Sequence, residues 1–162
     1  MIKGFTNDYF SIIFIETRLS TMISSYNKSN GTHASNYNLV AGIHIEQNVR
    51  VRREDLASYL KTGKVPFIST AAMIVYMEQC CVALIDPNLP VGYDSVSSEM
   101  NVRHLNTAIE NEEIICRSHL KFIEGNKLFF DVAMVNKNGE SIGIGAHERY
   151  IICHNSFVEK HL

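Results

Sequence analysis

Residues 66–87 read PFISTAAMIVYMEQCCVALIDP, and this stretch decides the fold. Pro66 keeps the approach to it extended, and Ser69 or Thr70 can cap the first free amides of a helix. Pro87 prevents the helix from continuing past the residue before it. The stretch therefore predicts one helix between two prolines.

This helix carries one unexpected charge. From residue 71 to residue 85 nearly every side chain is apolar, so we expect a core helix that other structure covers on almost all sides. A membrane span is not expected, because it needs about 20 apolar residues and this run has Glu78 and Gln79 in its middle. Burying a carboxylate without a partner is costly, so Glu78 needs either a structural partner such as a buried Arg or a functional role.

The whole chain has 162 residues, of which 46% are hydrophobic and 20% charged, and its formal net charge is −2. These values fit one soluble domain and give no reason to expect nucleic acid or a membrane as a partner. The four cysteines form no C-x-x-C pair and no other metal-ligand spacing. We therefore expect reduced thiols, no metal and no cofactor, in a cytoplasmic protein.

The first part of the chain differs from the rest. A short apolar cluster at residues 10–15 is followed by the polar tract SSYNKSNGTHASNYN, which cannot bury enough surface to repay its ordering. The apolar cluster is too short for the core of a signal peptide. We expect residues 1–37 to form a poorly ordered extension and residues 38–162 to form the domain.

Side chains alternate with period two on both sides of the helix. Residues 38–49 predict a strand with one buried face, and residues 96–152 predict an antiparallel meander whose turns are EGNK and NKNGE. The expected faces are Val96, Ser98, Met100, Val102 and His104; Ile114, Cys116, Ser118, Leu120 and Phe122; Leu128, Phe130, Val132 and Met134; and Ile142, Ile144, Ala146, Glu148, Tyr150 and Ile152.

A strand, a long buried helix and three or four antiparallel strands follow the order of the hot-dog fold, an α+β fold in which a curled sheet wraps one central helix. Such a sheet has open edges and an uncovered face, so we expect a homodimer or a higher homo-oligomer. Arg50, Arg52 and Arg53 precede the helix and could form a solvated rim or meet a phosphate.

Three polar residues stand out in apolar surroundings: Thr70, Glu78 and His104. A nucleophile or water, a base and an orienting acid are what acyl transfer requires, although His104 taken alone favours the interpretation as a satisfied core histidine. If Thr70 and Glu78 are both helical, about 12 Å of helix separates them. Either Thr70 belongs to the capping loop and folds back, or the site is assembled with a second subunit.

Three segments, STAAMIVYMEQ, SVSSEMNVRHLNTA and GIGAHERY, resemble the fluoroacetyl-CoA thioesterase-like branch of hot-dog thioesterases. That branch has a Thr, a Glu eight residues later, a His twenty-six residues after the Glu, and a late G-x-H-E-R. Here these are Thr70, Glu78, His104 and residues 145–149. The resemblance covers about residues 38–153.

The resemblance implies Thr70, Glu78 and His104 as the catalytic set, with Arg149 near the substrate or in the charge balance of the site. Arg149 could alternatively pair with Glu148 or Glu99 across strands. We expect His147 at the surface or in an interface. The family's V-G-T segment reads Val96-Ser97-Ser98 here, so Ser97 stands where the family has a glycine beside the acyl group. This departure argues against selectivity for the fluoroacetyl group, but not against thioesters.

The expected activity is hydrolysis of a small acyl thioester, an acyl-CoA, to acid and thiol. His104 would act as general base, Glu78 would orient it, and Thr70 would be the nucleophile or hold the attacking water. Amides at the N-terminus of the helix would stabilise the oxyanion. The alternative from another class is a module that binds acyl-CoA or a partner protein without turnover.

Overall fold

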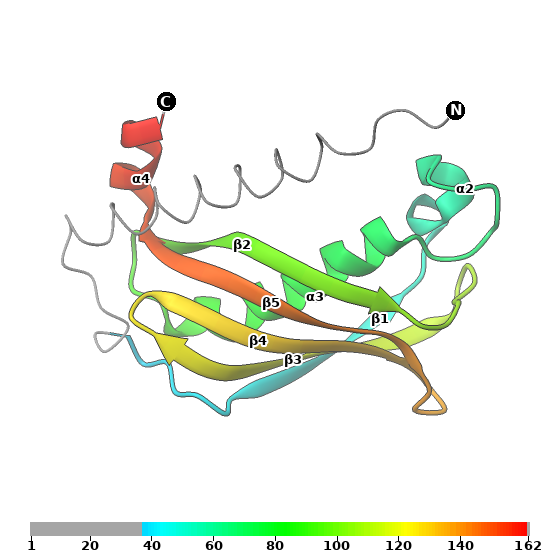
Figure 1. Cartoon of the computed structure of the whole chain (residues 1–162), viewed down its shortest axis with the longest axis horizontal. Helices are drawn as coiled ribbons and strands as arrows, with labels where there is room; N and C mark the ends of the chain where they lie inside the picture. Colours follow the sequence, from blue (N-terminus) through cyan, green and yellow to red (C-terminus); the bar gives the residue numbers. More distant parts are fainter. Residues whose placement is uncertain (1–36, 162) are drawn as a thin grey trace, which may run out of the picture.

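In the computed structural model, which describes residues 37–161, the predicted helix is α3 (Thr70–Ile85) (Figure 1). Ser69 caps it, because its Oγ accepts a hydrogen bond from the amide of Ala72 at 3.0 Å. A short 3-10 turn, Asp86–Asn88, follows at Pro87. The helix between the two prolines is therefore confirmed.

Five strands form one antiparallel sheet in the order β1-β3-β4-β5-β2, and Figure 1 shows α3 lying behind it. The other elements are β1 (His44–Arg50), the 3-10 turn η2 (Arg53–Asp55), α2 (Ala57–Leu60), β2 (Tyr93–His104), β3 (Glu113–Glu124), β4 (Lys127–Asn136), β5 (Ser141–Cys153) and α4 (His154–His161). The hot-dog arrangement predicted from the sequence is confirmed. No helix within the described residues is long and apolar enough to cross a membrane.

The core lies between α3 and the sheet. On the helix side it contains Met73, Met77, Cys80, Cys81 and Ile85, all without exposed surface. The described residues leave the opposite side of α3 uncovered: Ala71 and Gln79 are exposed, and Val75 keeps 49% of its surface. The prediction that α3 is covered on almost all sides is therefore wrong for residues 37–161 of the single chain, because one sheet can cover only one face of a helix.

Three register shifts change the predicted faces of the strands. One lies between Met134 and Val135 of β4, opposite the start of β5, where Ile142 is buried but Ile144 and Ala146 are exposed, so the predicted face of β5 is wrong. In β2 the register shifts between Ser97 and Glu99, so that Ser95 and Ser97 lie on the same side as Met100, and Val96 and Ser98 do not. In β3 a shift between Leu120 and Phe122 turns Phe122 outward, where it stacks on Phe129 with ring centroids 4.1 Å apart.

The predicted extension, residues 1–37, lies outside the described residues except for Tyr37. That side chain is buried, and its ring meets the ring of Tyr93 edge-on at 5.4 Å. Among the described cysteines, Cys81 lies in the core, and burial raises the pKa of its thiol to about 12. At neutral pH this thiol stays protonated, which is the behaviour of a core residue.

Candidate active site

Thr70 and His104 meet at one end of the molecule. Thr70 is the first residue of α3 and His104 is the last of β2, and Thr70 Oγ1 lies 3.0 Å from His104 Nδ1. Both side chains are exposed, so the interpretation of His104 as a core histidine is wrong. His104 Nε2 has no partner among the described residues, which leaves it free to bind an orienting group.

The start of α3 is held in place by the segment before it. The amide of Ser69 donates to the carbonyl of Asp55 at 2.8 Å. The Asp55 carboxylate is buried and accepts hydrogen bonds from the guanidinium of Arg52 and the hydroxyl of Tyr76. Tyr76 belongs to α3 itself, so Asp55 binds the helix at two points and fixes the position of Thr70.

Two amides of the first turn are available to a ligand. The amide of Ala72 is capped by Ser69 Oγ, and the amide of Met73 donates to the carbonyl of Ser69. The first amides of a helix have no intrahelical acceptor, so those of Thr70 and Ala71 point out of the helix end. Aligned donors at the positive end of a helix are suited to stabilise an oxyanion.

Glu78 lies elsewhere, about two turns further along α3. Because Thr70 is itself helical, the two residues are about 12 Å apart along the axis, and the alternative in which Thr70 folds back from a loop is wrong. Glu78 is partly exposed at 35%, and its Oε1 lies 3.9 Å from Nε2 of His147 on β5. The three predicted catalytic side chains therefore fall into two groups within one chain.

Arg149 belongs to the second group. Its side chain is only 6% exposed and faces α3. Its Nε donates to Ser95 Oγ at 2.9 Å and its Nη2 to the carbonyl of Ser95 at 2.7 Å. Glu148 lies on the other face and pairs with Lys127, so the alternative in which Arg149 pairs with Glu148 is wrong. Ser97 is the register partner of Arg149 and is half-buried beside it.

His147 is the main residue that sequence reasoning misplaced. It is 1% exposed, not at the surface, because it shares the helix-facing side of β5 with Arg149. The alternation of β5 contained the signal, since His147 and Arg149 are two residues apart and must face the same way.

Gly143 is a second residue that was missed. It is the register partner of His104, and a Cβ placed on it would come within 2.3 Å of Met73 Sδ. A side chain is therefore excluded at the point where α3 approaches β5, directly beside His104. A glycine on the inner face of a strand is the sequence signal for such a close approach.

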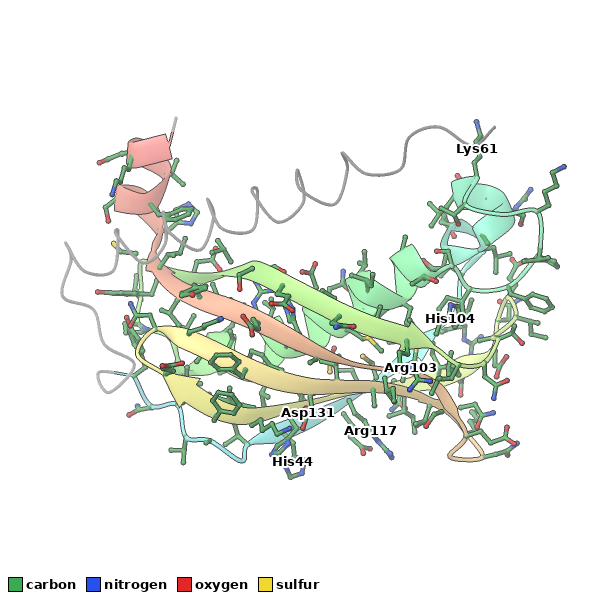
Figure 2. The ribbon with its side chains drawn as sticks, in the orientation of Figure 1. His44, Lys61, Arg103, His104, Arg117 and Asp131 are labelled. Carbon is green, nitrogen blue, oxygen red and sulfur yellow. The ribbon has the colours of Figure 1, made fainter. Side chains whose placement is uncertain are left out.

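Several exposed cations have no ion pair within the described residues. Arg50 pairs with Glu113 and Arg52 with Asp55, so the three arginines do not form one phosphate site. Among the described residues, the cations that lack a hydrogen-bonded or ion-paired partner are Arg53, Lys61, Lys64 and Arg103. Figure 2 shows Lys61 and Arg103 at the same end of the molecule as His104.

The described residues contain no group of three or more His, Cys, Asp or Glu side chains placed to hold a metal ion. The site that remains consists of a hydroxyl hydrogen-bonded to an imidazole, two amides without an acceptor among the described residues, and a separate carboxylate 3.9 Å from a buried imidazole that contacts a guanidinium. A hydroxyl, a base and oxyanion donors are the parts that acyl transfer uses.

Three solved structures of known proteins have a similar fold. A solved structure of the fluoroacetyl-CoA thioesterase FlK matches with 23% identity, a TM-score of 0.69, and coverage of 76% of this chain and 95% of that one. A thioesterase superfamily member from Thermus thermophilus matches with 26% identity, a TM-score of 0.69, and coverage of 75% and 88%. A hot-dog-like protein from Thermanaerovibrio acidaminovorans matches with 24% identity, a TM-score of 0.67, and coverage of 74% and 87%.

No curated protein sequence matches this chain. The family model described as fluoroacetyl-CoA-specific thioesterase, FlK, matches residues 51–155. This range contains α3, all of β2 to β5, and the Thr70, Glu78 and His104 positions. It spans well over half of the chain, which therefore belongs to the FlK family of hot-dog acyl-CoA thioesterases.

Proposed function

We propose that this protein hydrolyses a small acyl-CoA to the carboxylic acid and CoA, with Thr70 as nucleophile and His104 as general base. The observation that carries the proposal is the 3.0 Å contact between Thr70 Oγ1 and His104 Nδ1 at the free end of α3. This distance lets the imidazole take the hydroxyl proton directly.

The reaction proceeds in two steps. His104 Nδ1 removes the proton as Thr70 Oγ1 attacks the thioester carbonyl, and the amides of Thr70 and Ala71 receive the charge on its oxygen. The C–S bond breaks, and His104 returns the proton to the thiolate of CoA. Water then hydrolyses the Thr70 ester, with His104 again acting as base. The alternative is a Thr70 that only holds the attacking water.

The orienting carboxylate is Glu78 of the partner subunit. Within one chain about 12 Å of helix separates Thr70 from Glu78, so Glu78 cannot reach the free Nε2 of its own His104. Two exposed surfaces support a homodimer: the edge of β2, which no described strand covers, and the face of α3 around Val75. A second copy that covers both surfaces would bring Glu78 of one chain to Thr70 and His104 of the other across a two-fold axis.

The acyl group lies toward Ser97 and Arg149. Ser97 brings a hydroxymethyl group to the position where the resemblance has a glycine, directly opposite Arg149. The expected substrates are therefore short acyl groups without strong selectivity for fluoroacetyl. The CoA nucleotide would lie over Lys61 and Lys64, two cations that have no carboxylate partner within the described residues. The location that we propose is the cytoplasm, where acyl-CoA and free CoA are available.

The test is release of thiol from acetyl-, propionyl- and fluoroacetyl-CoA. Thr70→Ser should keep activity, and Thr70→Val, which has nearly the same shape, should lose about 100-fold or more in kcat. Mass spectrometry of quenched enzyme should find the acyl group on the peptide that carries Thr70. If Thr70→Val keeps a tenth of the activity and no acylated peptide forms, Thr70 is not the nucleophile. Binding of acyl-CoA without thiol release would identify the non-catalytic module instead.

A further inference from the structure

His147 is buried between β5 and α3 in one defined protonation state. Its Nδ1 lies 2.8 Å from the carbonyl oxygen of Glu99, and a carbonyl can only accept, so Nδ1 carries the hydrogen. Its Nε2 lies 3.2 Å from Nη1 of Arg149, and a guanidinium can only donate. Nε2 is therefore the unprotonated nitrogen, and His147 is a neutral imidazole.

This imidazole completes the set of groups that hold Arg149. Ser95 accepts two hydrogen bonds from the guanidinium and His147 accepts one, so three of the five N–H groups of Arg149 are bound. No carboxylate of the described residues lies within ion-pair distance of Arg149. The nearest contact between this pair and an acid is the 3.9 Å from His147 Nε2 to Glu78 Oε1.

We propose that His147 is a positioning residue: by accepting from Nη1 of Arg149, it holds the guanidinium charge at the place where its own Nε2 lies 3.9 Å from Glu78 Oε1, and so orients the carboxylate used in catalysis. This inference rests on the proposed function, in which Glu78 orients a catalytic histidine. His147 itself touches neither the substrate nor the reacting atoms.

The surroundings keep His147 neutral at the pH of the cell. Burial lowers the pKa of His147, and the charge of Arg149 lowers it further, against opposite effects from the Glu99 carbonyl, Glu78 and Glu148. The ring of Phe130 packs at 6.1 Å and brings no charge. The charge of Arg149 also acts on the thiol of Cys81, but burial raises the pKa of that thiol, so it stays uncharged. Nε2 is therefore available as an acceptor throughout the neutral range.

Two substitutions separate the two hydrogen bonds of the ring. In His147→Gln the amide oxygen lies near the position of Nε2 and can accept from Arg149. In His147→Asn the amide lies near the position of Nδ1, so it can donate to the Glu99 carbonyl but cannot reach Arg149. Both variants place a polar amide in the same buried site, and a purely structural role of His147 would not favour Gln over Asn.

With acetyl-CoA, we expect kcat of His147→Asn to fall about tenfold or more, the effect of losing a hydrogen bond to a charged group, with KM changing less. His147→Gln should stay within about threefold of wild type. If the wild type releases thiol and the Asn variant equals or exceeds the Gln variant, the inference is wrong. If the wild type releases none, the proposed function fails.

A second measurement does not depend on activity. ¹⁵N NMR of the imidazole nitrogens of the full chain at neutral pH, with His147→Gln to assign the signal, should find Nδ1 protonated and Nε2 unprotonated. The Nη1 signal of Arg149 should be retained in His147→Gln and lost or shifted in His147→Asn. A His147 ring that is protonated on Nε2 would overturn the inference whether or not the protein is active.

Discussion

Met73 of α3 lies so close to Gly143 of β5 that a Cβ at position 143 would come within 2.3 Å of the Met73 sulfur. Met73 is one turn after Thr70, and Gly143 is the register partner of His104. The close contact between Met73 and Gly143 therefore sets how near the start of α3, with Thr70, lies to the end of β2, with His104.

The first prediction concerns this contact. Gly143→Ala should lower the free energy of unfolding by about 1–3 kcal/mol, because the methyl group overpacks a site that contains the fully buried Met73. It should also reduce thiol release more than the stability loss explains, since α3 must move away from β5. Urea denaturation and steady-state kinetics measure the two effects.

Gly63→Ala is the matched control. A Cβ at position 63 would meet the Cβ of Ala57 at 3.5 Å, which is an ordinary contact, and position 63 needs no left-handed backbone. Its free energy of unfolding should stay close to that of the wild type. Equal stability losses in the two variants would show that Gly143 has no special role in helix packing.

The sequence was sufficient for the architecture because prolines and alternating side chains act locally. Pro66 and Pro87 mark the limits of α3, and the turn residues mark the ends of the strands. The bulge after Ser97 could not be predicted, because the alternation is broken by only one residue and the break is visible only through the partner strand. It changes which serines face Arg149, and so it affects the site directly.

The candidate site was predicted only in part for a similar reason. Spacing and resemblance identified Thr70 and His104, and the structure brings them together. The environment of Glu78 depended on His147 and Arg149, which are about 70 residues away in the chain and whose inward orientation follows from the pairing of β5. The alternation along β5 indicates that His147 and Arg149 share a face, but only the pairing of β5 with its neighbours shows that this face is the one toward α3.

The second prediction concerns the anchor of α3. Burial raises the pKa of Asp55, but hydrogen bonds from Arg52 and Tyr76 outweigh it, so the net pKa lies below its usual value. The ionised form therefore stabilises the fold above about pH 4, and this contribution is lost as the pH falls through the lowered pKa. Asp55→Asn should cost about 1–3 kcal/mol at pH 7, and its difference from the wild type should shrink below pH ~4.

Urea denaturation of both proteins between neutral and acid pH tests the sign of this effect. Glu113→Gln is the control, because Glu113 also pairs with cations, Arg50 and Lys137, but on the exposed surface. Such pairs contribute little, so this variant should follow the wild type closely. If the free energy of unfolding of Asp55→Asn is lower than that of the wild type by the same amount at every pH, the charge of Asp55 does not cause the stabilisation.

The third prediction concerns the CoA nucleotide. Lys61 and Lys64 are exposed cations without a partner in the described part of the chain, on the segment that precedes Thr70. The double variant Lys61→Glu with Lys64→Glu should raise KM for acetyl-CoA about tenfold at low salt, because CoA carries phosphates, and the effect should shrink as salt screens it. KM for acetyl-pantetheine, which has no phosphate, should not change.

The substrate pair separates two explanations. A rise in KM for both substrates would indicate damage to the site near Thr70 instead of lost phosphate binding. Lys121→Glu serves as the charge control, since Lys121 pairs with Asp131 on β4 and is far along the sheet from His104. Its KM for acetyl-CoA should remain that of the wild type.

The fourth prediction tests whether the site is shared between subunits. Thr70→Val and Glu78→Gln should each be nearly inactive alone. When equal amounts are unfolded together and refolded, half of the dimers combine the two variants, and each such dimer has one site with native Thr70, His104 and Glu78. The mixture should therefore recover about a quarter of the wild-type activity, if Glu78 acts on the Thr70 of the other chain.

The control mixture combines Thr70→Val with His104→Ala. Thr70 and His104 contact each other within one chain at 3.0 Å, so every mixed dimer lacks one of them in each site and no activity should return. Recovery in the first mixture and none in the second is expected only if the hydroxyl–imidazole pair and the carboxylate come from different chains. No recovery in either mixture, with dimers seen by light scattering, would place Glu78 in the site of its own chain and require α3 or β2 to move on substrate binding.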